Sequence, residues 1–323
     1  MNIPRRILLG LALAATFATT ASAQAWPNRP IRFVVPFPAG GGTDLIGREL
    51  TLRMIDATKW NIVVDNRPGS GGNIGIDSVA KSPADGYNVV LGQTSNLAIN
   101  PTLYSKLPYN PAKDLTPISM VASAPLALVV ATNSKYCTLA DLIAGAKANP
   151  GSLNFATSGN GTVAHPAMEL FQREAGIKML HIPYKGAAQG INDVMSERVE
   201  VYVSSIPTLI GHIKNGKMRA LAVTSLKRVD DLAQTPTIAE SGYKDFEAVT
   251  WFGVLGPANL PKDITARLNT EINKALQTPV LQKQLSEQGA DVKGSTPEQF
   301  GQLVRDEMTR WGKVVKDSGA KLD

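Results

Sequence analysis

The sequence predicts an α/β protein with mainly parallel sheets, covered by helices on both faces and divided into two lobes. Short apolar, β-prone runs alternate with segments whose apolar residues recur at helical spacing. Each apolar run is nearly continuous, which is typical of parallel strands buried on both faces. Two of these runs, at residues 33–35 and 153–156, lead into a loop of small residues and then a helix start. Because this unit occurs in both halves of the chain, it indicates two lobes.

The individual elements follow from local residue chemistry. The first strand ends at Pro36, because proline cannot donate to a β-ladder, and Thr43 opens an amphipathic helix. Thr296 is the expected cap of the last helix, with Pro297 in its first position. Strands are expected at residues 33–35, 62–64, 87–92, 126–131, 153–156, 179–183, 199–203, 220–224 and 251–255. Helices are expected at residues 43–55, 73–81, 139–148, 163–174, 187–196, 208–215, 261–276 and 297–316, and an irregular, proline-rich connection at 100–119.

The repeated unit predicts two lobes that face one another across a ligand cleft. We place the crossings between them near residues 123–125 and 246–248. Lobe I is then discontinuous, with residues 24–124 and 247–323, and lobe II covers residues 125–246. Closure of two such lobes on a ligand is a hinge motion.

Residues 1–23 have the pattern of a secretory signal peptide. Two arginines precede an apolar run at residues 7–18, and Ala21-Ser22-Ala23 matches the small-residue cleavage pattern. The run is shorter than the roughly 20 apolar residues that a membrane-spanning helix needs. The residue directly after the cleavage site is not a cysteine, so a lipid anchor is not expected there. The mature chain is therefore expected to be soluble and exported.

The composition argues against several classes of function. A formal net charge of +6 at pH 7, spread along the chain, does not indicate a nucleic-acid partner. Cys137 is the only cysteine, so the fold is not expected to depend on disulfides. One cysteine and three scattered histidines, His165, His181 and His212, do not indicate a metal site. We expect no metal and no cofactor.

The glycine loop at residues 36–44 favours an anionic ligand. Glycines at positions 40–42 leave backbone N–H groups open at a helix start, which carries partial positive charge. A nucleotide P-loop would need Gly-Lys-Ser/Thr, but Gly42 is followed by Thr43-Asp44, and the dinucleotide fingerprint needs another glycine spacing. Taken alone, the loop fits a plain strand-to-helix turn equally well.

Residues 157–162, Thr-Ser-Gly-Asn-Gly-Thr, repeat the design in the second lobe. A molecule with a carboxylate at each end could then be held from both lobes. Ser158 with a nearby histidine superficially resembles a nucleophile loop, but the G-x-S-x-G elbow is missing and the spacing indicates no Asp–His pair. We therefore predict a binding protein and not an enzyme.

Together these motifs resemble the periplasmic substrate-binding proteins of tripartite tricarboxylate transporters, the Bug-type receptors. The resemblance extends over essentially the whole mature chain. It rests on residues 26–32, WPNRPIR; 36–44, PFPAGGGTD; 65–75, DNRPGSGGNIG; 85–87, DGY; 100–104, NPTLY; 156–162 with His165; 183–186, PYKG; 221–225, LAVTS; 236–237; and 251–253, WFG.

The resemblance implies a monomeric Venus-flytrap receptor in the periplasm. Such receptors capture a small organic acid anion: a dicarboxylate, a tricarboxylate, an aromatic carboxylate or an acidic amino acid. They deliver it to a membrane permease of one large and one small transmembrane subunit. A different role on the same fold, in which the ligand switches contacts with a sensor or membrane partner, is the alternative.

The resemblance also implies which residues hold one carboxylate of the ligand, partly through ordered water. In lobe I these are Phe37 as a wall, Ala39, Gly40 and Gly41 as backbone donors, and Thr43 and Asp44 as supports of the loop and its water. In lobe II they are Ser158, Gly161 and Thr162 as hydroxyl and backbone donors, His165 behind them, and Asp193 near the closing face.

Some of these positions keep a second interpretation. His165 either donates to the ligand or its water, or caps the loop, and Asp193 either lines the site or faces solvent. Asp44 and Asp193 cannot attract a carboxylate, so they would accept from N–H groups or water, or pair with a ligand amino group. The second glycine loop, at residues 69–72, is expected to be a structural turn. Arg67 and Lys185 could steer anions towards the site, but the preferred interpretation is that both are solvated loop charges.

Overall fold

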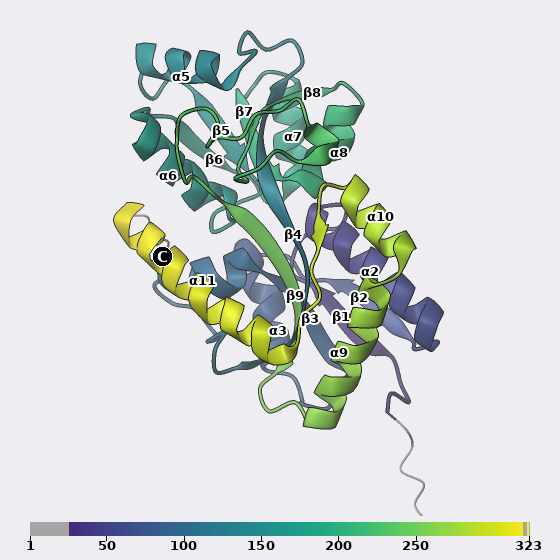
Figure 1. Ribbon diagram of the computed structural model, residues 1–323. Coiled ribbons are helices and arrows are strands. Elements are labelled where there is room, and N and C mark those ends of the chain that lie inside the picture. Colours follow the sequence, from purple (N-terminus) through teal and green to yellow (C-terminus); the bar gives the residue numbers. More distant parts are fainter. Residues whose placement is uncertain (1–25, 319–321, 323) are drawn as a thin grey trace, which may run out of the picture.

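The computed structural model describes residues 26–318 and residue 322, so the signal peptide predicted at residues 1–23 lies outside the described residues. Ten strands are joined by hydrogen bonds in the order β2-β1-β3-β9-β4-β7-β5-β6, with β10 and β8 also paired to β4. Figure 1 shows that they form two groups, one above the other, connected through β4 and β9. We call these groups lobe I and lobe II.

Lobe I contains a mixed sheet whose parallel strands lie at one edge. β1 (Ile31–Val35) pairs in parallel with β2 (Ile62–Asn66) and β3 (Asn88–Gln93), and β3 pairs antiparallel with β9 (Val249–Pro257). A short strand, β10 (Asp291–Val292), pairs antiparallel with β4. The apolar side chains of β1 and β3 are almost completely buried, as the continuous apolar runs predict.

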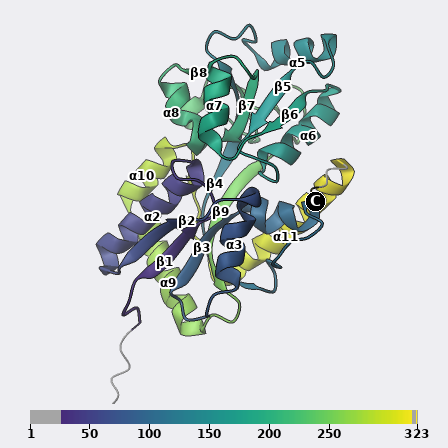
Figure 2. The ribbon, with the colours of Figure 1, turned by 180° about the vertical axis from the view of Figure 1, so that it is seen from behind.

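Helices cover this sheet from two sides. They are α2 (Gly42–Thr58), α9 (Lys262–Leu276) and α10 (Pro279–Glu287) on one side, and α3 (Asn73–Ala80), α4 (Asn100–Leu103), the π-helix η2 (Ser95–Ile99) and α11 (Pro297–Ser318) on the other. A single 3₁₀ turn, η1 (Ser70–Gly72), precedes α3. Figures 1 and 2 show α2 and α10 on one flank of the strands and α11 on the opposite flank.

Lobe II repeats the strand-helix alternation. Parallel strands β5 (Asn154–Thr157), β6 (Leu180–Pro183) and β7 (Val201–Ser205) lie side by side, and β8 (Met218–Val223) pairs antiparallel with β4. The helices of this lobe are α5 (Leu139–Ala148), α6 (Ala164–Ala175), α7 (Ala187–Met195), α8 (Ile206–Lys214) and the short η3 (Asp230–Leu232). Because α6, α7 and α8 each follow a parallel strand, their N-termini lie at the same edge of the sheet.

The two lobes share one long strand. β4 (Leu115–Ala131) pairs with β9 from Leu115 to Pro125 and then, from Leu126 onward, with β7 and β8. The backbone N–H of Ala248, just before β9, donates to the carbonyl of Thr224, just after β8. The predicted boundaries after residues 124 and 246 lie at these changes of partner, and the division into lobes stays a prediction.

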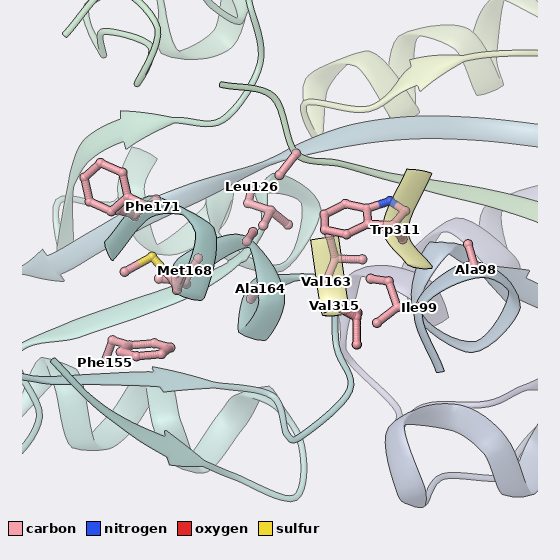
Figure 3. Packing of buried hydrophobic residues seen from close by; sticks show 14 of the residues in the cluster. Ala98, Ile99, Leu126, Phe155, Val163, Ala164, Met168, Phe171, Trp311 and Val315 are labelled. Carbon is pink, nitrogen blue, oxygen red and sulfur yellow. The ribbon is translucent and has the colours of Figure 1, made fainter. Parts of the chain in front are cut away.

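Hydrophobic packing also joins the two lobes. The largest buried cluster includes Leu126 of β4, Phe155 of β5 and Trp311 of α11. Figure 3 shows Trp311 and Val315 beside Val163, close to the start of α6. The C-terminal helix thus returns to pack against both strand groups, although most of its contacts are with η2, α4 and β4.

Two parts of the predicted element list are wrong. The connection predicted as irregular at residues 100–119 contains α4 and the first residues of β4, because β4 accommodates Pro117 at a register shift between Pro117 and Ser119. Helix α10 was not predicted. It has only two buried apolar residues, Leu281 and Leu285, one turn apart, so its periodic signal is short.

A substitution at Gly253 of β9 tests how tightly α11 packs on the sheet. A Cβ added at Gly253 would overlap the ring of Phe300, which is fully buried. We expect Gly253→Ala to lower the free energy of unfolding by about 1–3 kcal/mol, the usual cost of overpacking a core. Urea denaturation measures this. The matched control is Gly211→Ala in α8, where an added Cβ meets nothing within 4 Å; it should be neutral or stabilising by up to about 1 kcal/mol.

Candidate functional site

A cavity of about 400 Å³ lies where the two lobes meet. Both predicted loops contribute to its wall. We call it the interlobe cavity and define it by its lining residues, which are 37–43, Gln93 and Thr250 from lobe I, and Leu126, Ser158, 162–164, 185–189, Ile191, 203–205, Thr208 and His212 from lobe II. Its volume suits a small organic molecule.

Four helices begin at the wall of the interlobe cavity. The first residues of α2, α6 and α7, and the first turn of α8, are among its lining residues. None of these four N-termini has a side-chain cap; α3, α9 and α10, outside the lining, also lack one, and α5 has a complete capping box from Thr138 and Asp141. Uncapped N-termini leave backbone N–H groups and the positive ends of the helix dipoles facing the cavity.

The lobe I loop is held from behind by a buried carboxylate. Asp44 is 2% exposed and accepts hydrogen bonds from the Gly40 N–H, the Arg48 guanidinium and the Asn66 amide, each at 2.9 Å. Burial alone would raise the pKa of Asp44, but these three hydrogen bonds and the charge of Arg48 lower it below its usual range. Asp44 is therefore ionised, and its carboxylate is hydrogen-bonded to the loop.

The lobe II loop is fixed by its own hydroxyl groups. Thr162 Oγ1 donates to the Gly159 carbonyl at 2.8 Å, and Ser158 Oγ lies 2.8 Å from the Tyr202 hydroxyl. Gly161 has φ +75°, and a Cβ there would lie 2.7 Å from the Asn100 side-chain amide in lobe I. Only glycine combines this backbone conformation with so close an approach of the two lobes.

The lobes also touch on the other side of the cavity. The Gly42 N–H, at the start of α2, donates to Thr208 Oγ1 of α8 at 3.1 Å. A Cβ on Gly42 would lie 2.8 Å from this oxygen, and a Cβ on Gly186 would lie 3.0 Å from Pro38. The described arrangement is therefore a closed one, in which the helix starts of both lobes face a shared space.

Seven of the eleven predicted site residues line the interlobe cavity. They are Phe37, Ala39, Gly40, Gly41, Thr43, Ser158 and Thr162. Asp44, in the first turn of α2, and Gly161, in the lobe II loop, are not among the lining residues. The Asp44 carboxylate binds the Gly40 N–H, and Gly161 lies against Asn100 of lobe I. His165 and Asp193 are not among the lining residues.

Asp193 is hydrogen-bonded within lobe II, whereas His165 is held by ring stacking and its buried Nδ1 has no hydrogen-bond partner among the described residues. Asp193 accepts hydrogen bonds from the Tyr184 hydroxyl at 2.6 Å and the Arg198 guanidinium at 3.0 Å. The His165 ring stacks on His181 with 4.3 Å between ring centroids, and His181 Nε2 lies 2.7 Å from Thr157 Oγ1 at the base of the loop. Burial lowers the pKa of His165 to about 4, so its ring is neutral at neutral pH.

The chain matches a family model described as the tripartite tricarboxylate transporter family receptor over residues 46–320. It belongs to this receptor family. Protein BugT of Bordetella pertussis is 40% identical over the full length of both chains.

Two solved structures are similar throughout. An R. palustris protein determined with adipate has a TM-score of 0.89 at 36% identity, covering 92% of this chain and all of that one. The periplasmic binding protein BugD has a TM-score of 0.87 at 32% identity, covering 92% and 99%.

Family membership confirms three of the predictions. The receptor has the α/β periplasmic-binding-protein fold, since its structure matches that of BugD. It is a periplasmic solute receptor, and the family binds without catalysis.

No helix among the described residues is both long and apolar enough to cross a membrane. Within the same residues, no cluster of three or more His, Cys, Asp or Glu side chains is placed to hold a metal ion.

Several lining residues of the receptor were not predicted from the sequence. They include Gln93, Lys185 and its neighbours at 186–189, Ser204, Ser205, Thr208 and Thr250. A sequence pattern could have identified two of these residues. Gly186 and Ser205 each stand at the junction of a strand and the following helix, as Gly41 does. Gln93 and Thr250 carried no local signal, because only the pairing of β3 with β9 brings their strands together.

The buried histidine pair predicts a loss of stability in acid. The pKa of His165 is lowered from 6.5 to about 4 by burial, and that of His181 to about 3 by burial and by the neighbouring His165. The unfolded chain therefore binds more protons below pH 6.5, and stability falls as the pH drops from 6.5 towards 4, by an amount on the order of 3 kcal/mol for each histidine. Urea denaturation across this range measures it.

A variant separates this pair from the carboxylates that titrate in the same range. His165→Phe keeps a ring for stacking and removes one titrating group, so its stability should fall less steeply between pH 6.5 and 4. His212→Gln, outside the pair, should retain most of the wild-type slope. Equal slopes in all three proteins would show that the pair does not control acid stability.

Proposed function

We propose that this receptor binds a small organic acid anion in the interlobe cavity and delivers it to a tripartite permease of one large and one small membrane subunit. The observation that carries the proposal is the convergence of four uncapped helix N-termini on a cavity without acidic lining residues. The similar R. palustris structure contains adipate, a dicarboxylate, which supports the same ligand class here.

Backbone dipoles suit the capture of a carboxylate that must later be released. Each uncapped N-terminus offers N–H donors that are already oriented, so binding needs no rearrangement of long cationic side chains. Bridging water retains most of the energy of a direct hydrogen bond, so a loop such as residues 39–41 can act through water. We assign the first carboxylate to this loop and to Ser158 and Thr162, opposite it across the cavity.

The two-lobed division is part of the proposal. Residues 24–124 and 247–323 would form one body, residues 125–246 the other, and the change of partner at Pro125 of β4 would be one hinge strand. In an open receptor the contact between Gly42 and Thr208 would break, which would expose the start of α2 to the incoming ligand. We further propose that the mature protein is an exported monomer that meets its permease in the closed, ligand-bound form.

Thermal unfolding with a ligand panel tests the ligand class. The panel contains succinate, malate, adipate, citrate, benzoate and glutamate, with sugars and nucleotides as comparison compounds. A ligand at 100 times its dissociation constant should add about 2.7 kcal/mol to the free energy of unfolding and raise the melting temperature. A shift with sugars or nucleotides and none with any organic acid would overturn the proposal. Uptake of the labelled ligand by cells lacking the receptor gene then tests delivery.

Gly41→Val tests the lobe I loop. Gly41 has φ −82° and ψ 166°, which any residue adopts, and an added Cβ contacts the protein only at the Pro38 carbonyl, at 3.6 Å. We expect unchanged stability without ligand and an affinity at least about tenfold weaker for whichever acid the panel identifies, because the side chain occupies the space of the guest. Isothermal titration calorimetry measures the affinity.

The control for this variant is Gly211→Val, at an exposed helix position outside the lining residues. It should bind as the wild type does. Wild-type affinity in Gly41→Val would remove the loop from the binding site.

A further inference from the structure

The charge of the interlobe cavity is carried by a single side chain. Lys185 is the only Lys or Arg among the lining residues, and no Asp or Glu lines the cavity. His212 also lines it, but burial, followed by the nearby charge of Lys217, lowers the pKa of its ring, so His212 is neutral at neutral pH. Apart from helix dipoles, the described wall therefore offers one positive charge and no negative one.

The backbone around Lys185 is fixed at the meeting point of the two loops. On one side the Tyr184 N–H donates to the Thr157 carbonyl, and on the other the Gly186 N–H donates to the Ser158 carbonyl, both at 3.1 Å. Gly186 in turn lies against Pro38 of lobe I, so closely that an added Cβ would be 3.0 Å from the proline ring. Lys185 therefore keeps its place beside the loop that carries Ser158 when the lobes are closed.

No acidic residue of the described chain neutralises Lys185. It forms no ion pair among residues 26–318, while thirteen ion pairs engage other cations there. Asp193 lies on the helix that follows Lys185, but its carboxylate is bound by Tyr184 and Arg198. Lys185 is exposed and also lines the cavity, so its unpaired ammonium group is available both to solvent and to a ligand.

We propose that Lys185 is the specificity-determining residue of the interlobe cavity and that it pairs with a second anionic group of the ligand. The inference rests on the proposed function, in which backbone dipoles and hydroxyl groups hold the first carboxylate. A dianionic acid satisfies both the dipoles and Lys185. A monoanion leaves Lys185 unpaired. An acidic amino acid brings an ammonium group that finds no carboxylate in the wall and is repelled by Lys185 and the helix N-termini.

Matched acids of one carbon skeleton test this selection. Isothermal titration calorimetry is carried out with succinate, butyrate and aspartate, and with glutarate, pentanoate and glutamate. For the wild-type protein we expect each dianion to bind at least about tenfold more tightly than the monoanion or the amino acid of the same length. Equal affinities within a trio would overturn the inference, while tight binding of any of the acids would leave the proposed function standing.

Variants at Lys185 identify the residue responsible. Lys185→Met keeps a long apolar stem and removes the charge, so we expect about a tenfold loss of affinity for succinate and glutarate and a change below about twofold for butyrate and pentanoate. Lys185→Arg should retain the preference for dianions. Lys147→Met, an exposed lysine of α5 outside the cavity, is the control for overall charge and should bind like the wild type.

Each remaining outcome has one meaning. If Lys185→Met weakens the monoanions as much as the dianions, Lys185 serves the first carboxylate and the inference is wrong. If it weakens neither, Lys185 does not contact the ligand and the inference is wrong. If the wild-type protein binds none of the six acids nor any acid of the wider panel, the proposed function fails, and the inference fails with it.

Discussion

The structure depends on one electrostatic constraint, which is that the positive ends of several helices must face the same small space. Helix N-termini repel one another at close range, and α2 and α8 meet so closely that the Gly42 N–H reaches Thr208. Topology imposes this arrangement, because α6, α7 and α8 each follow a parallel strand and so start at the same sheet edge, while α2 starts at the facing edge of lobe I. An anion between them would relieve the repulsion, so the arrangement of the helices favours the proposed anionic ligand.

Close approach of the lobes explains why glycines occupy the loops. Gly42 and Gly161 lie where a Cβ would be under 3.0 Å from atoms of the opposite lobe, whereas a Cβ on Gly41 meets only its own loop. The first two glycines therefore permit close approach of the lobes, and the third leaves space in the cavity for the proposed ligand. The difference between Gly41 and Gly42 could not be predicted from the run of glycines at residues 40–42, since it depends on which neighbour the opposite lobe supplies.

Sequence reasoning succeeded where the determining interactions are local. The strand, loop and helix at residues 31–58 follow from neighbouring residues, and the seven predicted residues that line the cavity were implied by the family resemblance. It failed where distant segments decide. The continuity of β4 through Pro117 depends on pairing with β9, and α10 is a helix mainly because Leu281 and Leu285 pack on lobe I. Lys185 was expected to be a solvated loop charge and is exposed in the structure, but the sequence did not predict that it also lines the cavity.

Two carboxylates of the receptor, Asp44 and Asp193, bear on the charge of the cavity wall as much as the helix N-termini do. Asp44 and Asp193 are both close in sequence to the cavity wall, and each would oppose an anionic guest if its charge faced inward. Each is instead turned away and paired with a cation four or five residues further along the chain, Arg48 or Arg198. Asp44 also binds the Gly40 N–H, so the same carboxylate that is removed from the cavity fixes the loop that serves it. An anion site built from weak dipoles requires this separation of charge, because one unpaired carboxylate in the wall would cancel what several N–H groups provide.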